Sequence, residues 1–266
     1  MSRGFYAATA AMMSDVNRFE TVANNLANIN THGFKRHQTL HHDFQEGFVK
    51  RVQSARLRLS LNAEGQLERE RVQDVARPIG QIGTGTYVTS SWTHFDPGAL
   101  QATESPLDLA LQGEGFFTVA GPDGEIHFTR NGHFKLNAEG ELVTHEGLNL
   151  LGRNGAIRLD PAAAFSVDAD GQIVSEGEVV DQLVLVDFDR PQLLVNEGAN
   201  RYIAIEGMEP RPSTAKVSQG FLEQANVDVA SEMVQMISAL RSYQISQKAL
   251  QSEDEMTGKL IEVGRV

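Results

Sequence analysis

The chain has 266 residues, of which 41% are hydrophobic, and its 23 Lys and Arg against 35 Asp and Glu give a net charge of −12. This length and apolar content suffice for one large domain or two modest ones with a genuine core. The acidic balance argues against a partner such as nucleic acid or an anionic membrane surface. The sequence has no run of 18 apolar residues that could span a bilayer, so we expect a protein that is not membrane-embedded. It contains no cysteine, which excludes disulfides and thiolate chemistry.

A helix is predicted at the N-terminus, where mostly apolar residues recur at alternating steps of four and three. These residues are Phe5, Thr9, Met12, Val16, Phe19, Ala23 and Leu26. Such steps are the heptad repeat of a coiled coil. Asn28 and Asn30 favour the end of this helix because their side chains compete for backbone hydrogen bonds, and Gly33 can adopt the positive φ that closes it. Charged residues from Asp15 to Glu20 interrupt the apolar stretch too early for a cleavable signal peptide.

Residues 34–75 are polar and rich in charged side chains, and we expect them to form an extended connector. Within it, Leu57, Leu59 and Leu61 alternate with polar residues, which predicts a strand. Glu64-Gly65 then indicates a turn, and residues 66–68 a returning strand.

Residues 76–221 predict a central, mainly antiparallel β domain. Short apolar runs alternate there with turn dipeptides, which are Asp123-Gly124, Asn131-Gly132, Glu139-Gly140 and Asp170-Gly171. Dipeptides of this kind between apolar runs indicate β-hairpins. The stretch 179–188 is the most apolar, and we expect it to be the most buried strand.

A second heptad repeat follows in residues 222–266, where we expect the C-terminal helix. Its members are Val229, Met233, Met236, Leu240, Tyr243, Gln247 and Leu250. Asn226 or Asp228 could cap this helix, and Glu232 would lie in its first turns. Matching heptads at both ends favour an α+β fold in which residues 1–33 and 222–266 pair as a coiled coil. Periodicity alone leaves open the alternative of two ordinary amphipathic helices packed on a core.

Signals for chemistry are weak in this sequence. His37 and His41 could share a metal on a helix, but no Cys or Glu completes a known ligand pattern and the segment reads as loop or strand. The sequence contains no Gly-x-Ser-x-Gly and no His-Glu-x-x-His motif. We therefore expect no catalytic residue, no metal site and no cofactor.

Several blocks resemble the bacterial flagellar rod and hook proteins, and they occur in the order that this family has. The N-terminal block contains Asn24, Asn25, Leu26, Ala27 and Asn28, followed by Gly33 and Phe34 within residues 31–36. Residues 82–85, 113–117 and 128–134 carry three central blocks, and residues 219–229 lead into the C-terminal helix. Together the blocks span nearly the whole chain.

This resemblance implies a structural subunit of the flagellar basal-body rod, most like the distal rod type, and no enzyme. It implies polymerisation with copies of itself into a hollow axial shaft that transmits torque to the hook. Other rod proteins, hook proteins, the flagellar export apparatus and the ring bushings are the implied partners. It further implies export without a cleaved signal to the basal body in the cell envelope.

Two alternatives remain open at this point. The first is a proximal rod subunit or rod-like paralogue, because residues 106–111 also resemble proximal rod types. The second is a catalytic or carbohydrate-binding β domain with helical appendages.

Overall fold

The computed structural model describes residues 3–43, 47–50, 57–61, 67–71, 78–82, 86–160 and 163–264. The chain divides into two compact units, each built from segments far apart in the sequence. The first unit comprises Met1–Asn17, Leu40–Ser90 and Ala239–Val266, and the second comprises Arg18–Thr39 and Ser91–Ser238. Each of the two long helices therefore contributes one part to each unit.

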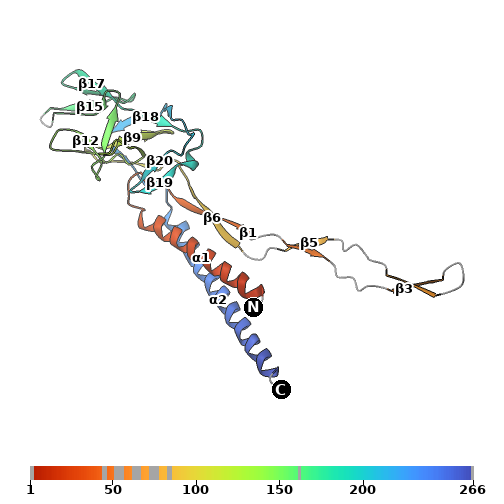
Figure 1. Cartoon of the computed structure of the whole chain (residues 1–266). Coiled ribbons are helices and arrows are strands. Elements are labelled where there is room, and N and C mark those ends of the chain that lie inside the picture. The colour runs from red at the N-terminus through yellow and green to blue at the C-terminus, as the bar shows by residue number, and fades with distance from the viewer. Residues whose placement is uncertain are drawn as a thin grey trace. The chain divides into compact units, whose positions relative to one another are not determined.

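The two helices are α1 (Arg3–Ala27) and α2 (Val229–Val263), at the two ends of the chain (Figure 1). The helix α1 ends where Asn28 begins a turn, and the Asn28 side chain donates to the Asn24 carbonyl oxygen at 2.9 Å. At the start of α2, Asp228 Oδ2 accepts a hydrogen bond from the Ser231 backbone N–H at 3.1 Å, which confirms Asp228 as a cap. Neither helix, over the residues described, has the length and hydropathy needed to cross a membrane.

Three strand pairs lie between α1 and residue 93. The first, β1 (His37–Asp43) with β6 (Thr86–Thr93), crosses the boundary between the units, and the other two lie in the first unit. These are β2 (Gly47–Lys50) with β5 (Pro78–Ile82), and β3 (Leu57–Leu61) with β4 (Leu67–Arg71). The antiparallel β3–β4 pair confirms both strands predicted in this segment. The predicted turn at Glu64-Gly65 lies outside the described residues.

The second unit contains a mainly antiparallel β domain, which we define as residues 91–223. Its largest sheet has the strand order β11-β12-β13-β9-β10-β20-β19, with β14 beside β13, and with β18 between β9 and β21. These strands are β9 (Phe116–Ala120), β10 (Ile126–Thr129), β11 (Lys135–Leu136), β12 (Leu142–Val143), β13 (Asn149–Gly152), β14 (Gly155–Ala156), β18 (Leu185–Asp187), β19 (Val195–Gly198), β20 (Arg201–Ile203) and β21 (Arg211–Pro212).

Smaller sheets complete the β domain. One has three strands in the order β15-β16-β17, and two have two strands each, β8 with β22 and β7 with β23. The remaining bounds are β7 (Leu100–Ala102), β8 (Leu109–Gln112), β15 (Phe165–Val167), β16 (Gln172–Ser175), β17 (Glu178–Gln182), β22 (Lys216–Gln219), β23 (Phe221–Glu223) and the 3₁₀ helix η1 (Pro191–Leu193). The strands β22 and β23 come from the C-terminal end of the domain. Each pairs with a strand about a hundred residues earlier in the chain, β22 with β8 and β23 with β7.

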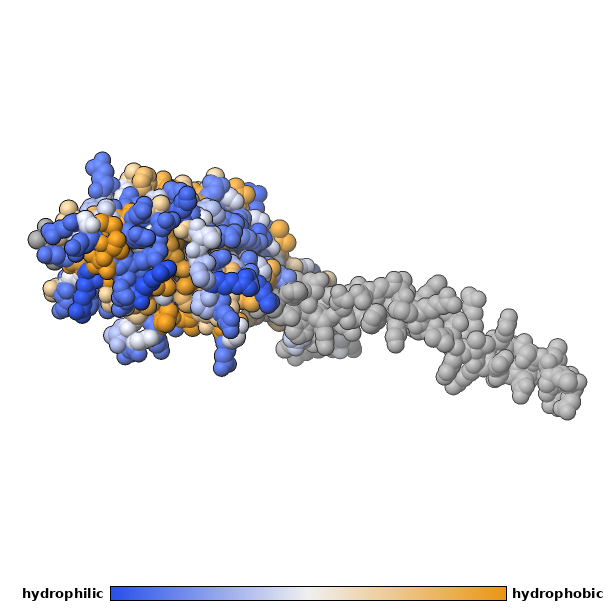
Figure 2. All heavy atoms as spheres, turned by 90° about the horizontal axis from the view of Figure 1, so that it is seen from above, coloured by the Kyte–Doolittle hydropathy of each residue, from blue (hydrophilic) through white to orange (hydrophobic). Residues whose placement is uncertain are grey.

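The core of the β domain consists of two hydrophobic clusters. The larger is mainly aliphatic and centres on fully buried residues such as Leu150 and Ile173. The smaller is aromatic, with Phe128 edge-on to Phe188 at a centroid separation of 4.9 Å and Tyr202 among the buried rings. The face of the domain turned to the viewer in Figure 2 mixes hydrophilic and hydrophobic side chains without one dominant apolar area.

Three of the four predicted hairpins are confirmed. Gly124, Gly140 and Gly171 each have a positive φ and each lie between two antiparallel neighbours, β9–β10, β11–β12 and β15–β16. The hairpin predicted at Asn131-Gly132 was wrong. This dipeptide follows β10 and precedes His133, which forms an isolated antiparallel bridge with Asp108, the residue before β8. Gly132 is required there for close approach: its carbonyl oxygen accepts from the Leu109 N–H at 3.0 Å, and a Cβ would overlap the Leu109 carbonyl oxygen.

The prediction of one most-buried strand over residues 179–188 was also wrong. This stretch forms two strands, β17 and β18, which belong to different sheets. Val179 is 62% exposed because β17 is the edge of a three-stranded sheet, whereas Val186 and Phe188 are buried in the aromatic cluster. Hydrophobicity alone could not separate an exposed edge strand from a buried one.

We predict that Gly132→Ala destabilises the β domain by about 3 kcal/mol, since an added methyl group must push two backbones apart. Gly124→Ala is the matched control, because nothing lies within 4 Å of a Cβ there and only its φ of 80° is unfavourable. The control should cost about 1 kcal/mol. Urea denaturation followed by circular dichroism measures both, and equal losses would contradict a role for Gly132 in close packing.

Candidate assembly site and its buried ion cluster

The end of α1 and the start of α2 meet in the second unit through the Asn25 side chain, which is 1% exposed. Its Nδ2 donates to the His37 carbonyl oxygen at 2.8 Å and to Glu232 Oε2 at 3.2 Å, and its Oδ1 accepts from the His37 N–H at 2.9 Å. Glu232, also 1% exposed, lies 3.7 Å from the Arg36 guanidinium. A buried amide with this many partners fixes the two helix ends and β1 in one arrangement.

The block after α1 packs against the β domain. Gly33 has a φ of 69° and donates its N–H to the Glu223 carbonyl oxygen at 2.8 Å. A Cβ on Gly33 would collide with the backbone of Arg130, so the two chains approach as closely as a glycine allows. Phe34 is buried, with its ring edge-on to the His37 ring at 5.6 Å. Gly33 therefore serves this contact, and the helix itself has already ended at Ala27.

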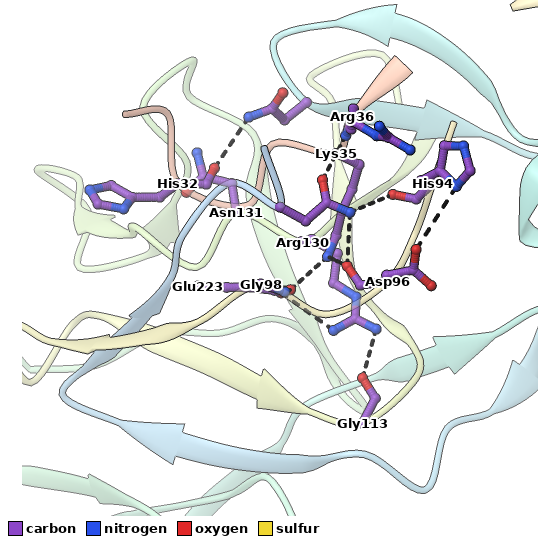
Figure 3. A network of polar contacts seen from close by, with 12 residues as sticks. His32, Lys35, Arg36, His94, Asp96, Gly98, Gly113, Arg130, Asn131 and Glu223 are labelled. Atoms are coloured by element: carbon purple, nitrogen blue, oxygen red, sulfur yellow. Dashed lines mark hydrogen bonds and ion pairs between the residues drawn. The ribbon is translucent and has the colours of Figure 1, made fainter. Parts of the chain in front are cut away.

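The next residue, Lys35, belongs to a buried ion cluster with Glu223 and Arg130 (Figure 3). Lys35 Nζ lies 2.6 Å from Glu223 Oε1, and Arg130 Nη1 lies 3.4 Å from Glu223 Oε2. The side chains of Lys35, Arg130 and Glu223 are 0%, 2% and 1% exposed, respectively. They come from the segment after α1, from the residue directly after β10 and from β23.

Backbone groups also bind the charged ends of the ion cluster, although Arg130 Nε is buried without a hydrogen-bond partner among the described residues. Lys35 Nζ donates to the Asp96 carbonyl oxygen at 2.8 Å, and Arg130 Nη2 donates to the Gly113 carbonyl oxygen at 2.7 Å. Glu223 Oε1 also accepts from the Gly98 N–H at 2.8 Å. Each charge is thus held by both an ion partner and a main-chain group, as burial of charge requires.

The cluster holds two cations for one carboxylate, and burial shifts the pKa values of both cations. Burial lowers the pKa of the Lys35 ammonium below its ordinary value, although Glu223 acts to raise it. Burial likewise lowers the pKa of the Arg130 guanidinium against the opposing effect of Glu223. A buried ion pair adds little net stability over an apolar pair, but loss of one partner leaves an unpaired charge inside the protein.

Asn226, the other predicted helix cap, has a different role. Its Oδ1 accepts from the Arg36 N–H at 2.7 Å, and its Nδ2 donates to the carbonyl oxygens of His94 and Asp96 at 2.8 and 3.0 Å. It therefore joins the segment after α1 to the segment after β6, directly before α2 begins.

The predicted heptad residues of α1 fall into two groups in this chain. Phe5 and Val16 are 37% and 40% exposed, whereas Met12, Phe19 and Leu26 are partly buried. The most deeply buried positions of α1 are instead Ser14, Val22 and Asn25.

The predicted residues of α2 divide in the same way. Val229, Met233 and Leu240 are between 43% and 52% exposed, whereas Met236, Tyr243 and Leu250 are partly buried. The two positions of α2 that are 1% exposed are Glu232 and Ala239. The heptad read from the sequence of α2 missed both positions, because it followed the large apolar residues Val229, Met233 and Leu240.

The candidate metal residues lie apart from any ligand set. On β1, His37 Nδ1 contacts Thr93 Oγ1 at 3.0 Å, and His41 Nδ1 contacts Ser14 Oγ at 2.6 Å. Within the part of the chain that the structure describes, no group of three His, Asp or Glu side chains could hold a metal ion.

We predict that Glu223→Gln lowers the free energy of unfolding of the second unit by about 3 kcal/mol, because it leaves two buried cations without a counter-charge. The matched control is Asp189→Asn, which removes an ion pair with Arg211 whose side chains are more than 60% exposed and should cost about 0–1 kcal/mol. Chemical denaturation measures both. If Glu223→Gln lowers the free energy of unfolding no more than the control does, the charge of Glu223 does not stabilise the second unit.

Three family profiles match separate parts of the chain. "Flagella basal body rod protein" matches residues 5–35, which contain α1 and the block up to Lys35. "Flagellar hook protein FlgE/F/G D1 domain" matches residues 110–175 in the β domain. "Flagellar basal body rod FlgEFG protein C-terminal" matches residues 218–263, which contain Glu223 and α2. The three charged members of the ion cluster thus come one from each matched region.

Relatives extend the match over the full length. The flagellar basal-body rod protein FlgG of Borreliella burgdorferi is 30% identical, with 97% of each chain covered. FlgG of Bacillus subtilis is 30% identical over all of both chains, and the rod protein FlgF of Caulobacter vibrioides is 30% identical with 98% of each covered. This is a family of structural proteins of the flagellum basal body and not of enzymes, which removes the catalytic alternative. The chain belongs to the flagellar basal-body rod protein family, as a structural rod subunit of the distal type.

Proposed function

We propose that this subunit polymerises into a hollow axial shaft that transmits torque to the hook, and that α1 and α2 pair as a coiled coil in its inner layer. Membership of the rod family implies assembly with copies of itself and with other rod and hook proteins. The observation that carries the mechanical part is the buried Asn25–Glu232 hydrogen bond, which joins the two helix ends beside the β domain. We infer that this buried contact stiffens the junction between the helices and the β domain, as a shaft that transmits torque requires.

The pairing of the helices is supported by the pattern of covered residues on α2. From its first turn, the buried and partly buried side chains other than Gln235 recur at steps of four and three, as in a coiled coil. They are Glu232, Met236, Ala239, Tyr243, Ser246, Leu250 and Glu253. We call this set the covered row of α2. It shares Met236, Tyr243 and Leu250 with the heptad read from the sequence.

Two contacts support an antiparallel register. In the second unit Asn25 contacts Glu232, and in the first unit the Gly4 Cα faces the Glu253 carboxylate so closely that a Cβ would overlap it. The same number of residues separates Gly4 from Asn25 on α1 and Glu232 from Glu253 on α2. Two helices that run in opposite directions keep one register over this whole length only if such spacings match.

The domain division proposed from the sequence fits this function. Residues 1–33 and 222–266 would form the inner layer, 76–221 the outer layer, and 34–75 a connector between neighbouring subunits. The flagellar export apparatus would deliver the chain without a cleaved signal, and ring bushings would surround the periplasmic portion of the rod.

The proposal predicts opposite outcomes for two neighbouring residues of α2. Ala239→Asp should disrupt the helix pair within the chain by about 3 kcal/mol or more, because Ala239 is 1% exposed and a carboxylate there would be buried without a partner. Leu240→Asp should leave the free chain folded, since Leu240 is 44% exposed, and should weaken assembly.

Circular dichroism of the free chain and negative-stain microscopy of concentrated protein make the two measurements. Tubes or protofilaments from the unmodified chain support the proposal. Tubes of normal length from Leu240→Asp would contradict a role for the exposed face of α2 in assembly, and failure of the unmodified chain to assemble at any concentration would contradict polymerisation itself.

A further inference from the structure

The hairpin of β19 and β20 holds the segment after α1 at two points, and we call this hairpin the clamp. Asn200 Nδ2 donates to the His32 carbonyl oxygen at 3.2 Å. Asn196 Nδ2 lies 3.2 Å from His37 Nε2. Ala199, in the turn between the two strands, has a φ of 50°, a costly conformation that persists only where surrounding contacts hold it. The closed clamp therefore depends on these contacts.

His37 connects the clamp to the junction of the two helices. Its backbone N–H and carbonyl oxygen are both bound by the Asn25 side chain, which also donates to Glu232 of α2. Its Nδ1 lies 3.0 Å from Thr93 Oγ1 on β6. One imidazole ring thus lies between the clamp and the contacts that fix the ends of α1 and α2.

The hydrogen bonds around this ring determine its protonation state. The Gly198 N–H donates to Asn196 Oδ1 at 2.6 Å, and a backbone N–H can bind only the oxygen of a side-chain amide. The NH₂ group of Asn196, which is a donor, therefore faces His37 Nε2. Since Nε2 must accept, the proton of neutral His37 lies on Nδ1 and is donated to Thr93 Oγ1.

Protonation of His37 is incompatible with this arrangement. Both ring nitrogens of a histidinium are donors, so the new Nε2–H points at the NH₂ group of Asn196. Asn196 cannot turn its oxygen toward the ring without losing the Gly198 N–H. Burial, which penalises the charged ring, also lowers the pKa of His37 from its ordinary value of 6.5. The closed clamp therefore fits the neutral imidazole and not the histidinium.

Among the described residues, charged groups on the elements around His37 are paired with one another. The pairs, with the distances between their charged atoms, are Glu232 with Arg36 (3.7 Å), Lys35 with Glu223 (2.6 Å), His94 with Asp96 (3.9 Å) and Glu197 with His127 (3.2 Å). Arg201 of β20 alternates with Tyr202, the register partner of Asn196, and so lies on the other face of the hairpin. These carboxylates are bound to other cations and do not offset the cost of a charged ring.

We propose that the clamp is acid-sensitive, so that a proton on His37 releases the β19–β20 hairpin from the segment after α1. The ring then leaves Asn196 for water, and the helix junction loses one of its attachments to the β domain. The open form binds the proton more tightly than the closed form, so acid shifts the population toward it. The clamp is fully closed above the ordinary histidine pKa of 6.5 and weakens as the pH falls below it.

Amide hydrogen exchange of the free full-length chain tests this inference, with each rate divided by the intrinsic rate at the same pH. The amides of His37 and Gly198 report on the clamp, because both N–H groups are hydrogen-bonded in the closed form. Their protection should fall below about pH 6.5, by up to about tenfold for each pH unit, because one proton is bound. Equal protection at about pH 7.5 and about pH 5 would overturn the inference.

Two variants separate His37 from the other titratable groups. His37→Gln cannot be protonated, although its Oε1 can still accept from Asn196, so its protection should not change over this pH range. Glu197→Gln is the matched control, since it alters the neighbouring residue of β19 and removes the pair with His127. The control should keep the pH dependence of the unmodified chain. A pH dependence that persists in His37→Gln would overturn the inference, whatever the control does.

Asn196→Asp tests the sign of the effect. Its carboxylate can accept from both the Gly198 N–H and a protonated Nε2, so the pKa of His37 should rise above that in the unmodified chain. Protection of Gly198 should then not fall with acid. An NMR titration of the His37 ring measures the pKa, and equal values in the variant and the unmodified chain would contradict the contact with Asn196. None of these measurements requires polymerisation, so this inference can fail while the proposed function stands.

Discussion

The carboxylate of Glu223 is the contact on which the second unit depends, because it connects the two ends of the chain to the β domain. It binds Lys35 from the segment after α1 and Arg130, which directly follows β10, and it lies in β23, a few residues before α2. Each of these ions is buried, so none can be satisfied by water if a partner is missing. The cluster therefore forms only when all three segments are in place, and it specifies their arrangement more than it adds net stability.

The sequence predicted the type and position of most elements, because their signals are local. Heptad spacing located both helices, Asp228 marked the start of α2, and three Gly-containing turns marked hairpins. It failed at Asn131-Gly132, where the same dipeptide serves a close backbone contact with Leu109, a neighbour more than twenty residues earlier in the chain. Such a contact leaves no periodic trace in the sequence.

The ion cluster was missed for a related reason, although its members lay within blocks already singled out. Lys35, Arg130 and Glu223 each lie in a different motif, and their neighbours in the sequence do not mark them as buried. Lys35 is followed by Arg36, and Arg130 lies between polar residues. What no single sequence reveals is that residues so far apart meet, since that depends on how β7, β10 and β23 are arranged.

The faces of the helices explain why the heptads were only partly informative about packing. Heptad analysis weights large apolar residues, yet the most deeply covered positions of the two helices include Ser14 and Ala239. Small side chains allow two helices to approach closely, and the large ones are then displaced to the flanks, where a single chain cannot cover them. A subunit built this way folds with apolar surface still exposed on Met233 and Leu240. Such surface is a liability in a monomer, but in a protein that assembles it is the surface that neighbouring subunits can cover.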